Sequence, residues 1–580
     1  MYLRTTQRRN KDGSIVRYVQ VAHNRKVDGV THAEVLLNLG REDRLDRDGL
    51  TRLVASINRY LGEPAPAALP GDAAQLVGDH LHVTESRPMG TVYLLDGLWR
   101  MLGVDDALRK ALGPRRFTTD VERVLFALVA NRAIDPMSKL SAAEWASHDA
   151  AIPGLTSMDE DQAYRAMDVL IEADAQAKVQ EAVFFAVANL LNLEVDVLLF
   201  DTTSTYFERD TEEEGDHAFR VYGHSKDHRK DLPQIVIGLA VTKEGIPVRC
   251  WCWPGNTTDV TVLPEVKDSM RDWRLGRVVT VVDRGFSSEA NLAYLKRAGG
   301  HYIAGERMRD GSPLVEAALS RQGRYSQVRD NLRVKEVKLD AAPDRRWVIC
   351  HNPSEAGRDK TQRDAALVHV RAELDRIKTL RDRATKTPAK ASTRTAGKTS
   401  GKADGKSVEP AHVKAECALR DHPAYGRWVR QQPSGRLVID RAKVTAEERL
   451  DGKYLLSTSD PDLTPEDIAL GYKNLLEAER GFRDLKSTLE LRPVHHHLEP
   501  RIRAHVLLCW LALLLIRVAE RSTDLTWRRI AIELGRVHAV TLTGSAGSVV
   551  HVTPLTTTQT GILAACKVTP PPTVTTLTPA

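Results

Sequence analysis

Two short apolar runs, rich in valine, constrain this chain more than any other feature, because each run ends in an aspartate. The first covers residues 195–201 and closes on Asp201, and the second covers residues 278–283 and closes on Asp283. Runs of this length and composition predict buried strands. A carboxylate at the end of such a strand leaves the core, so each strand brings an acid to a place where a site can form.

A third acid, Glu479, lies in a segment with helical spacing. Tyr472, Glu479 and Lys486 are seven residues apart, about two helical turns, so we expect them to share one face of one helix. Glu477 is only two residues from Glu479 and would point about 200° away from it. Two aspartates on strands that face a glutamate on a helix are suited to a pair of divalent cations, because Mg²⁺ and its substitute Mn²⁺ prefer oxygen ligands.

Each acid taken alone also has a simpler interpretation. An aspartate after a strand often forms a turn or caps a helix, and a lone glutamate on a polar helix face is most often only solvated. Asp196, Asp210 and Asp484 are nearby competitors. The joint placement of Asp201, Asp283 and Glu479 favours the catalytic interpretation over these alternatives.

The segments around the three acids resemble the DDE transposases of bacterial insertion sequences. The most similar group, the IS-four type, has a Tyr-x-x-Arg-x-x-x-Glu-x-x-x-x-x-x-Lys signature around its last acid. Tyr472, Glu479 and Lys486 are in register with it, whereas Leu475 stands where the group has arginine. The likeness continues in segments 201–207, 222–229, 482–487 and 492–496. It covers residues 195–305 and 465–515, and more loosely the N-terminal third.

The resemblance implies a cut-and-paste DNA transposase that cleaves the terminal inverted repeats and then joins the freed strand to target DNA. Asp201 would bridge two metal ions, while Asp283 and Glu479 would each complete one site. The implied partners are double-stranded DNA, as transposon ends and target, and a second copy of the chain as a homodimer on paired ends. The residues expected to contact DNA are Tyr472, Arg483, Lys486, Lys226, Arg229 and Arg284.

Other interpretations of these features stay open. Arg483 follows Glu479 by four residues, which also suits an ordinary helical ion pair, and the cations of loop 220–230 also suit a merely solvated surface. Because Leu475 removes one expected cation, the alternative function is a catalytically decayed or domesticated DNA-binding protein of transposase origin. A ribonuclease-H-like nuclease that acts without strand transfer would share the same metal site.

The order of elements predicts the fold class of the catalytic part. Three strands, the last two joined by a turn at Glu244 and Gly245, precede alternating helices and strands up to residue 305, which is the order of a ribonuclease-H-like fold. The 196 positions between Asp283 and Glu479 (479 − 283) exceed what such a fold needs, so we expect an insertion. The predicted class is α/β: a ribonuclease-H-like core interrupted by a large insertion domain and preceded by a small sheet and a helical domain.

At 580 residues the chain is too long for one core, and changes in periodicity predict six regions. They are a small basic β-rich module at 1–45, a helical DNA-binding domain at 46–190, the first part of the core at 191–309, an insertion domain at 310–465 with a Lys/Thr/Ala-rich linker at 384–409, the second part of the core with the glutamate-bearing helix at 466–535, and a poorly ordered tail at 536–580.

Composition limits the compartment. The net charge of +6 is compatible with a polyanionic partner without requiring one. Six scattered cysteines without a C-x-x-C pair argue against a disulfide framework and a structural zinc site, and predict a reducing cytoplasm. The N-terminus lacks the apolar segment of a signal peptide, so we expect none. The apolar stretch 506–516 is too short to cross a bilayer. We therefore expect a cytoplasmic protein without a membrane partner, and the resemblance adds association with a bacterial nucleoid.

Overall fold

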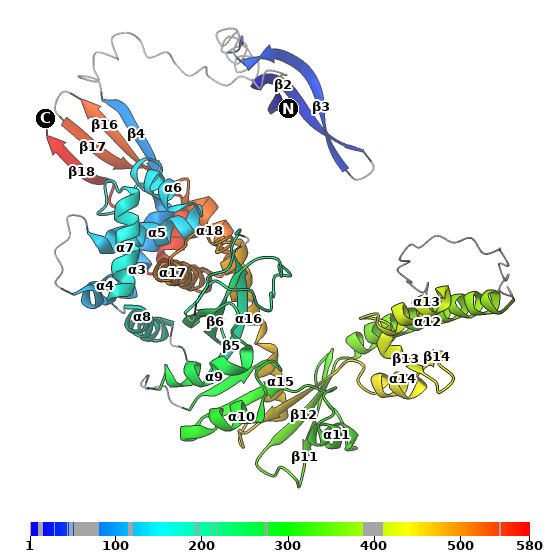
Figure 1. The fold of residues 1–580 in the computed structure, drawn as a ribbon. Helices are drawn as coiled ribbons and strands as arrows, with labels where there is room; N and C mark the ends of the chain where they lie inside the picture. The colour runs from blue at the N-terminus through cyan, green and yellow to red at the C-terminus, as the bar shows by residue number, and fades with distance from the viewer. Residues whose placement is uncertain are drawn as a thin grey trace, which may run out of the picture. The chain divides into compact units, whose positions relative to one another are not determined.

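The computed structural model describes most of the chain, which divides into two compact units (Figure 1). The smaller unit holds residues 1–82 with 543–547, and the larger holds residues 83–542 with 548–579. Within these units the described residues are 2–9, 15–27, 30–42, 45, 50, 81–113, 120–173, 175–191, 193, 196–209, 211–215, 217–271, 273, 277–386, 410–544 and 547–579. Most of the predicted linker, from residue 387 to 409, lies outside them.

The smaller unit contains a three-stranded antiparallel sheet where the sequence predicts a β-rich module. Its strands β1 (Tyr2–Arg9), β2 (Ile15–Val27) and β3 (Val30–Arg41) pair in sequence order. Residues 46–80 of the predicted helical domain lie outside the described residues, apart from Leu50.

Helices dominate the larger unit up to residue 191. They are α3 (Gly90–Met101), α4 (Val104–Leu112), α5 (Val121–Ile134), α6 (Lys139–Glu144), a π-helical turn (Trp145–Asp149), α7 (Glu160–Glu172) and α8 (Ala175–Leu191). Helix α17 (Glu499–Thr523) packs against α5 and α7. By length and composition α17 could cross a membrane, but 94% of its most apolar window is buried in the protein, as a core helix would be.

A nine-stranded sheet forms the centre of the larger unit, in the order β10-β11-β12-β15-β9-β8-β5-β6-β7. Strand β5 (Val197–Tyr206) pairs antiparallel with β6 (Gln234–Thr242), which pairs antiparallel with β7 (Pro247–Pro254). On its other side β5 is parallel to β8 (Val279–Val282), which is parallel to β9 (His301–Gly305). Helices α9 (Asp259–Asp268) and α10 (Glu289–Leu295) provide the connections around β8.

The segment 310–465 does not form the self-contained insertion that its length suggests. Four of its strands extend the central sheet: β10 (Ser326–Arg329), β11 (Leu332–Lys338), β12 (Arg346–His351) and β15 (Lys453–Thr458). Strand β15 pairs antiparallel with β9. The physical reason is that β9 would otherwise be an edge strand, whose unpaired backbone groups accept a further strand.

Only the middle of this segment has a hydrophobic core of its own. Helix α12 (Pro353–Lys386) packs against α13 (Ala411–Arg420) and the hairpin of β13 (Val429–Gln431) and β14 (Leu437–Ile439). Trp428 and Val370 lie at the centre of that small core. Helices α11 (Pro313–Ser320) and α14 (Arg441–Glu448) complete the segment.

The prediction of a poorly ordered tail at 536–580 is wrong for residues 538–544 and 547–579. After α18 (Trp527–Leu534) they contain β16 (His538–Gly544), β17 (Gly547–Val552), α19 (Thr557–Ala565) and β18 (Val574–Pro579). The strands form a sheet in the order β18-β17-β16-β4, with β4 at His82–Pro88. The tail is rich in threonine and valine, which favour strands once a partner edge is present.

Candidate active site

Asp201 and Asp283 lie side by side because of the register between two parallel strands. Phe200 of β5 is the partner of Val282 of β8, and the next residue on each strand is the aspartate. Residues at matching positions of neighbouring strands point to the same face of the sheet, so both carboxylates leave that face. The two strands are about 4.8 Å apart. Strand β5 does not end at Asp201, as the sequence suggests, but continues to Tyr206 because residues 201–206 still pair with β6. Asp201 therefore lies level with the end of β8 but in the middle of its own strand.

Glu479 reaches the same cleft from helix α16 (Leu476–Ser487). The helix packs closely on the sheet at Gly481, where a Cβ atom would lie 2.8 Å from Leu239 Cδ2 of β6. Glu479, Asp201 and Asp283 all line one cleft of about 670 Å³. Glu477 lines a different pocket, with Arg480 and Arg517 among its neighbours, in agreement with the helical spacing. The structure thus brings the three predicted acids together.

Tyr472 is not on the helix that carries Glu479. It belongs to α15 (Pro465–Lys473), and α16 begins only at Leu476. Tightened turns separate the two helices: the Leu475 N–H donates to the Tyr472 carbonyl, and the Glu477 N–H donates to the Asn474 carbonyl. The prediction of a single helix is wrong at this point, because residues 474 and 475 form a turn between the two helices. Leu475 in this turn is buried, with 7% of its surface exposed.

The Tyr472 hydroxyl donates a hydrogen bond to Asp283 Oδ1 at 2.6 Å. The ring stacks with that of Tyr454, at 5.9 Å between centroids, and lies against Gly305 of β9, where a side chain would overlap it. Burial and the charge of Asp283 raise the pKa of Tyr472. Tyr472 therefore stays a donor and restrains the orientation of Asp283.

The surroundings of Asp201 disfavour the charged form of its carboxyl group. Loss of hydration raises the pKa of Asp201 to about 6, and the charges of Asp283 and Asp259 contribute in the same direction. Lys226 and the Thr202 N–H, which donates to Asp201 Oδ1 at 2.7 Å, act against this increase in the pKa. Asp259, in the first turn of α9, was missed in the sequence. Its only local signal is an acid at the start of a predicted helix.

The ammonium groups of two predicted DNA-contacting lysines are bound by acceptors of the protein itself. Lys486 Nζ donates to Thr203 Oγ1 at 2.6 Å and to Asp227 Oδ1 at 2.7 Å. Lys226 Nζ donates to the Thr202 carbonyl at 2.8 Å and to Thr202 Oγ1 at 2.7 Å. These contacts favour roles in holding the site together.

The other three predicted cations remain near the surface. Arg229 pairs with Asp231 at 2.8 Å and lies over the Tyr206 ring, 5.1 Å from its centroid. Arg284 and Arg483 are exposed, and Arg284 lines the cleft of the three acids. Further cations along this cleft, which sequence reasoning missed, are Lys473 at the end of α15, Arg309 after β9, and Lys453 at the start of β15.

The donor set of the cleft fits a hard divalent cation, because three carboxylates line it and such ions prefer oxygen ligands. The side chains are not yet gathered around one point. Within the part of the chain that the structure describes, no three His, Cys, Asp or Glu side chains lie as close together as the ligands of a metal ion. Asp283 is turned toward Tyr472 instead.

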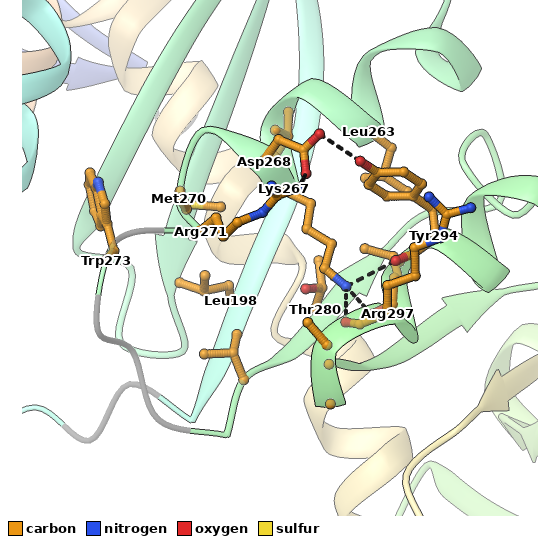
Figure 2. Close-up of a pocket in the computed structure, with 16 residues that line it drawn as sticks. Leu198, Leu263, Lys267, Asp268, Met270, Arg271, Trp273, Thr280, Tyr294 and Arg297 are labelled. Atoms are coloured by element: carbon orange, nitrogen blue, oxygen red, sulfur yellow. Dashed lines mark hydrogen bonds and ion pairs between the residues drawn. The ribbon is translucent and has the colours of Figure 1, made fainter.

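A second cavity, of about 250 Å³, lies toward the amino ends of β5 and β8, between the last turns of α9 and α10 (Figure 2). Its charged groups are matched within the protein. Lys267 Nζ donates to the carbonyls of Tyr294 and Leu295 at 2.9 and 2.6 Å, and the Tyr294 hydroxyl donates to Asp268 Oδ2 at 2.6 Å. This cavity contains none of the predicted site residues.

Comparison with known proteins agrees with the geometry. No curated protein matches the sequence. A cryo-EM structure of the piggyBac transposase synaptic complex with hairpin DNA matches with a TM-score of 0.36 and 10% identity, over 76% of this chain and 79% of that chain, which is too slight to indicate a shared fold. Residues 3–68 match the N-terminal domain of the IS1634 family transposases, and residues 196–515, more than half of the chain, match the transposase DDE domain. The chain therefore belongs to the DDE transposases of insertion sequences.

Proposed function

We propose that this transposase cleaves DNA at the terminal inverted repeats of its element and transfers the freed strand to target DNA by a cut-and-paste route. The observation that carries the proposal is the convergence of Asp201, Asp283 and Glu479 on one cleft from β5, β8 and α16. The strand order β7-β6-β5-β8-β9, with β5, β8 and β9 parallel, supports a ribonuclease-H-like core as the scaffold.

The three carboxylates would hold Mg²⁺, or Mn²⁺ in its place, with Asp201 in the centre and Asp283 and Glu479 on either side. Such ions, when bound, activate the attacking oxygen and stabilise the charge on the leaving oxygen of a phosphodiester. Tyr472 would hold the Asp283 carboxylate in place through its hydroxyl. The exposed cations Arg284, Lys473 and Arg483, two of which line the cleft, would bind phosphates beside the scissile bond.

The partners follow from this reaction. Double-stranded DNA is the substrate, both as transposon ends and as target. We propose a homodimer on paired ends, because each end must be held while the other is processed. A cytoplasmic protein associated with the nucleoid of a bacterium would meet such DNA directly.

The first experiment is Mg²⁺-dependent cleavage of a duplex that carries the element's own ends. Asp201→Asn, Asp283→Asn and Glu479→Gln should each lose roughly 10³-fold or more in cleavage rate, since several kcal/mol of transition-state stabilisation is removed. Glu477→Gln is the matched control, because it changes the same residue type on the same helix but in another pocket. DNA binding should persist in all four variants. Cleavage that survives Glu479→Gln would exclude Glu479 as the third acid.

Leu475 favours one other function, a DNA-binding protein that has lost catalysis. It is buried and lines the cleft where the IS-four signature has an arginine. A wild-type protein that binds the ends but never cuts them, with Mg²⁺ or with Mn²⁺, would support this alternative. Cleavage without joined products would instead indicate a nuclease that does not transfer strands.

A further inference from the structure

Asp259 and Lys226 lie behind the acids, on the other face of β5. Side chains alternate along a strand, so Thr202 points away from the face that Asp201 occupies. Thr202 Oγ1 donates a hydrogen bond to Asp259 Oδ1, and Lys226 Nζ forms an ion pair with Asp259 Oδ2 at 3.2 Å. The three side chains thus form one group directly behind the strand position of Asp201.

Asp259 also touches the turn that carries Asp283. A Cβ atom on Gly285 would lie 3.2 Å from Asp259 Oδ2, so the carboxylate rests against this turn. The turn is closed by the Phe286 N–H, which donates to the Asp283 carbonyl at 2.9 Å. One side chain at the start of α9 therefore contacts both acid-bearing segments.

A second connection joins the same two elements. The buried Asn291 of α10 donates from Nδ2 to the Val260 carbonyl at 2.9 Å and to the Phe286 carbonyl at 3.1 Å. The first turn of α9 is thereby tied to the turn after Asp283. Any displacement of Asp259 would be transmitted to the separation between Asp201 and Asp283.

Lys226 is fixed more firmly than a surface lysine in an ordinary ion pair. Its backbone N–H donates to Ser204 Oγ at 2.8 Å, and its ammonium group donates to both the carbonyl and the hydroxyl of Thr202. An exposed ion pair alone contributes at most about 1 kcal/mol to stability. Here the same ammonium group also holds the backbone of the residue that follows Asp201.

We propose that Asp259 and Lys226 form a positioning pair that sets the distance between Asp201 and Asp283 for cation binding. The inference rests on the proposed function of the three acids and assigns a role that does not require contact with DNA. Groups that orient metal ligands from behind typically contribute about 10- to 100-fold in metal affinity.

The sign of the effect of Lys226 separates positioning from simple electrostatics. Replacing Lys226 with a neutral residue removes a positive charge near the site, which by itself would tighten cation binding. Replacing Asp259 removes a negative charge, which by itself would weaken it. A positioning pair predicts weaker binding in both cases, and no further loss when both residues are changed, because they act as one unit.

The test is a Mn²⁺ titration of the full-length protein without DNA, read as the rise in the thermal unfolding midpoint that ligand binding causes. Asp259→Asn and Lys226→Met should each need about tenfold more Mn²⁺ than wild type for the same rise. The double variant should need no more Mn²⁺ than the single variant that binds Mn²⁺ more weakly. Asp268→Asn is the matched control, because it removes the same charge at the other end of the same helix. It should bind Mn²⁺ as wild type does.

Lys226→Met that binds Mn²⁺ as tightly as wild type, or more tightly, would overturn the pair. If Lys226→Met does not fold, Thr202→Val removes the hydroxyl that joins the two residues while keeping a β-branched side chain, and it should also bind more weakly. Wild-type protein that does not respond to Mn²⁺ would contradict the proposed function itself. A normal wild-type response with unaffected Asp259→Asn and Lys226→Met would contradict only the positioning pair.

Discussion

The two ends of β5 and β8 contain the same kinds of contact. At the carboxyl ends the Tyr472 hydroxyl donates to Asp283 at 2.6 Å, and toward the amino ends the Tyr294 hydroxyl donates to Asp268 at 2.6 Å. A lysine ammonium group donates to backbone carbonyls at each end as well, from Lys226 at the first and from Lys267 at the second (Figure 2).

The two ends differ in the balance of charge. Hydrogen bonding from Tyr294 lowers the pKa of Asp268, whereas loss of hydration and neighbouring acids raise the pKa of Asp201 to about 6. Asp268 also pairs with Arg271, while Asp201 shares its cleft with two further carboxylates. Groups whose pKa is strongly perturbed are typical of functional sites. This difference supports the proposed catalytic role of the carboxyl ends, and we expect the contacts at the amino ends to contribute to stability instead.

The largest expected effect is a separation of stability from activity at Asp201. The pKa of Asp201 in the fold, about 6, lies above its ordinary value of 3.8, so the folded state binds more protons between these values and loses stability as the pH rises through them. Without metal, Asp201→Asn should be more stable than wild type at pH 8, by up to about 3 kcal/mol, and equal to it below pH 4. It should also lose cleavage.

Urea unfolding of both proteins in EDTA at several pH values measures this difference. Asp268→Asn provides the comparison from the amino end and should not gain stability at pH 8. A wild type whose stability does not fall relative to Asp201→Asn between pH 4 and pH 7 would show that Asp201 is not under electrostatic strain.

Tyr472→Phe should have the next largest effect. The phenyl ring keeps the stacking on Tyr454, but the hydrogen bond to Asp283 is lost, so we expect cleavage to fall about 10- to 100-fold and the Mg²⁺ requirement to rise. Tyr294→Phe removes a hydrogen bond of the same length from Asp268 at the other end and should cleave as wild type does. Equal effects of the two substitutions would remove the distinction between the ends.

The smallest effect on activity is expected for Lys267→Met. The ammonium group of Lys267 donates to three carbonyls at the end of α10, and its loss should reduce the free energy of unfolding by about 1–3 kcal/mol. Cleavage measured well below the unfolding midpoint should be unchanged. A loss of cleavage in the folded variant would show that the amino end influences the site.

Much of the site was predictable because its signals are local. Valine-rich runs predict β5 and β8, and the shared register that sets Asp201 beside Asp283 follows once both strands are parallel neighbours. Helical spacing alone separates Glu479 from Glu477, and the two do line different pockets. Tyr472 was expected on the Glu479 helix because spacing carries no information about the turn at Leu475.

The errors arose where distant segments meet. No local pattern shows that β15 pairs with β9 and so extends the sheet, because the two strands are about 150 residues apart and their pairing depends on an open sheet edge. The same holds for the tail, whose strands β16, β17 and β18 form one sheet with the remote strand β4. The length of the segment between Asp283 and Glu479 suggested a separate domain, and residue types suggested a loose end.

The sequence by itself determined which acids, strands and family this chain has, because β-branched runs, helical spacing and the order of motifs are properties of short segments. Only the tertiary structure decided what each charge does. Lys226 and Lys486 are residues of the type that contacts DNA, yet their ammonium groups donate to acceptors of the protein. Lys226 donates to Thr202, and Lys486 donates to Thr203 and Asp227. A cation binds whichever partner the fold places within reach, and for these lysines that partner is supplied by residues remote in sequence.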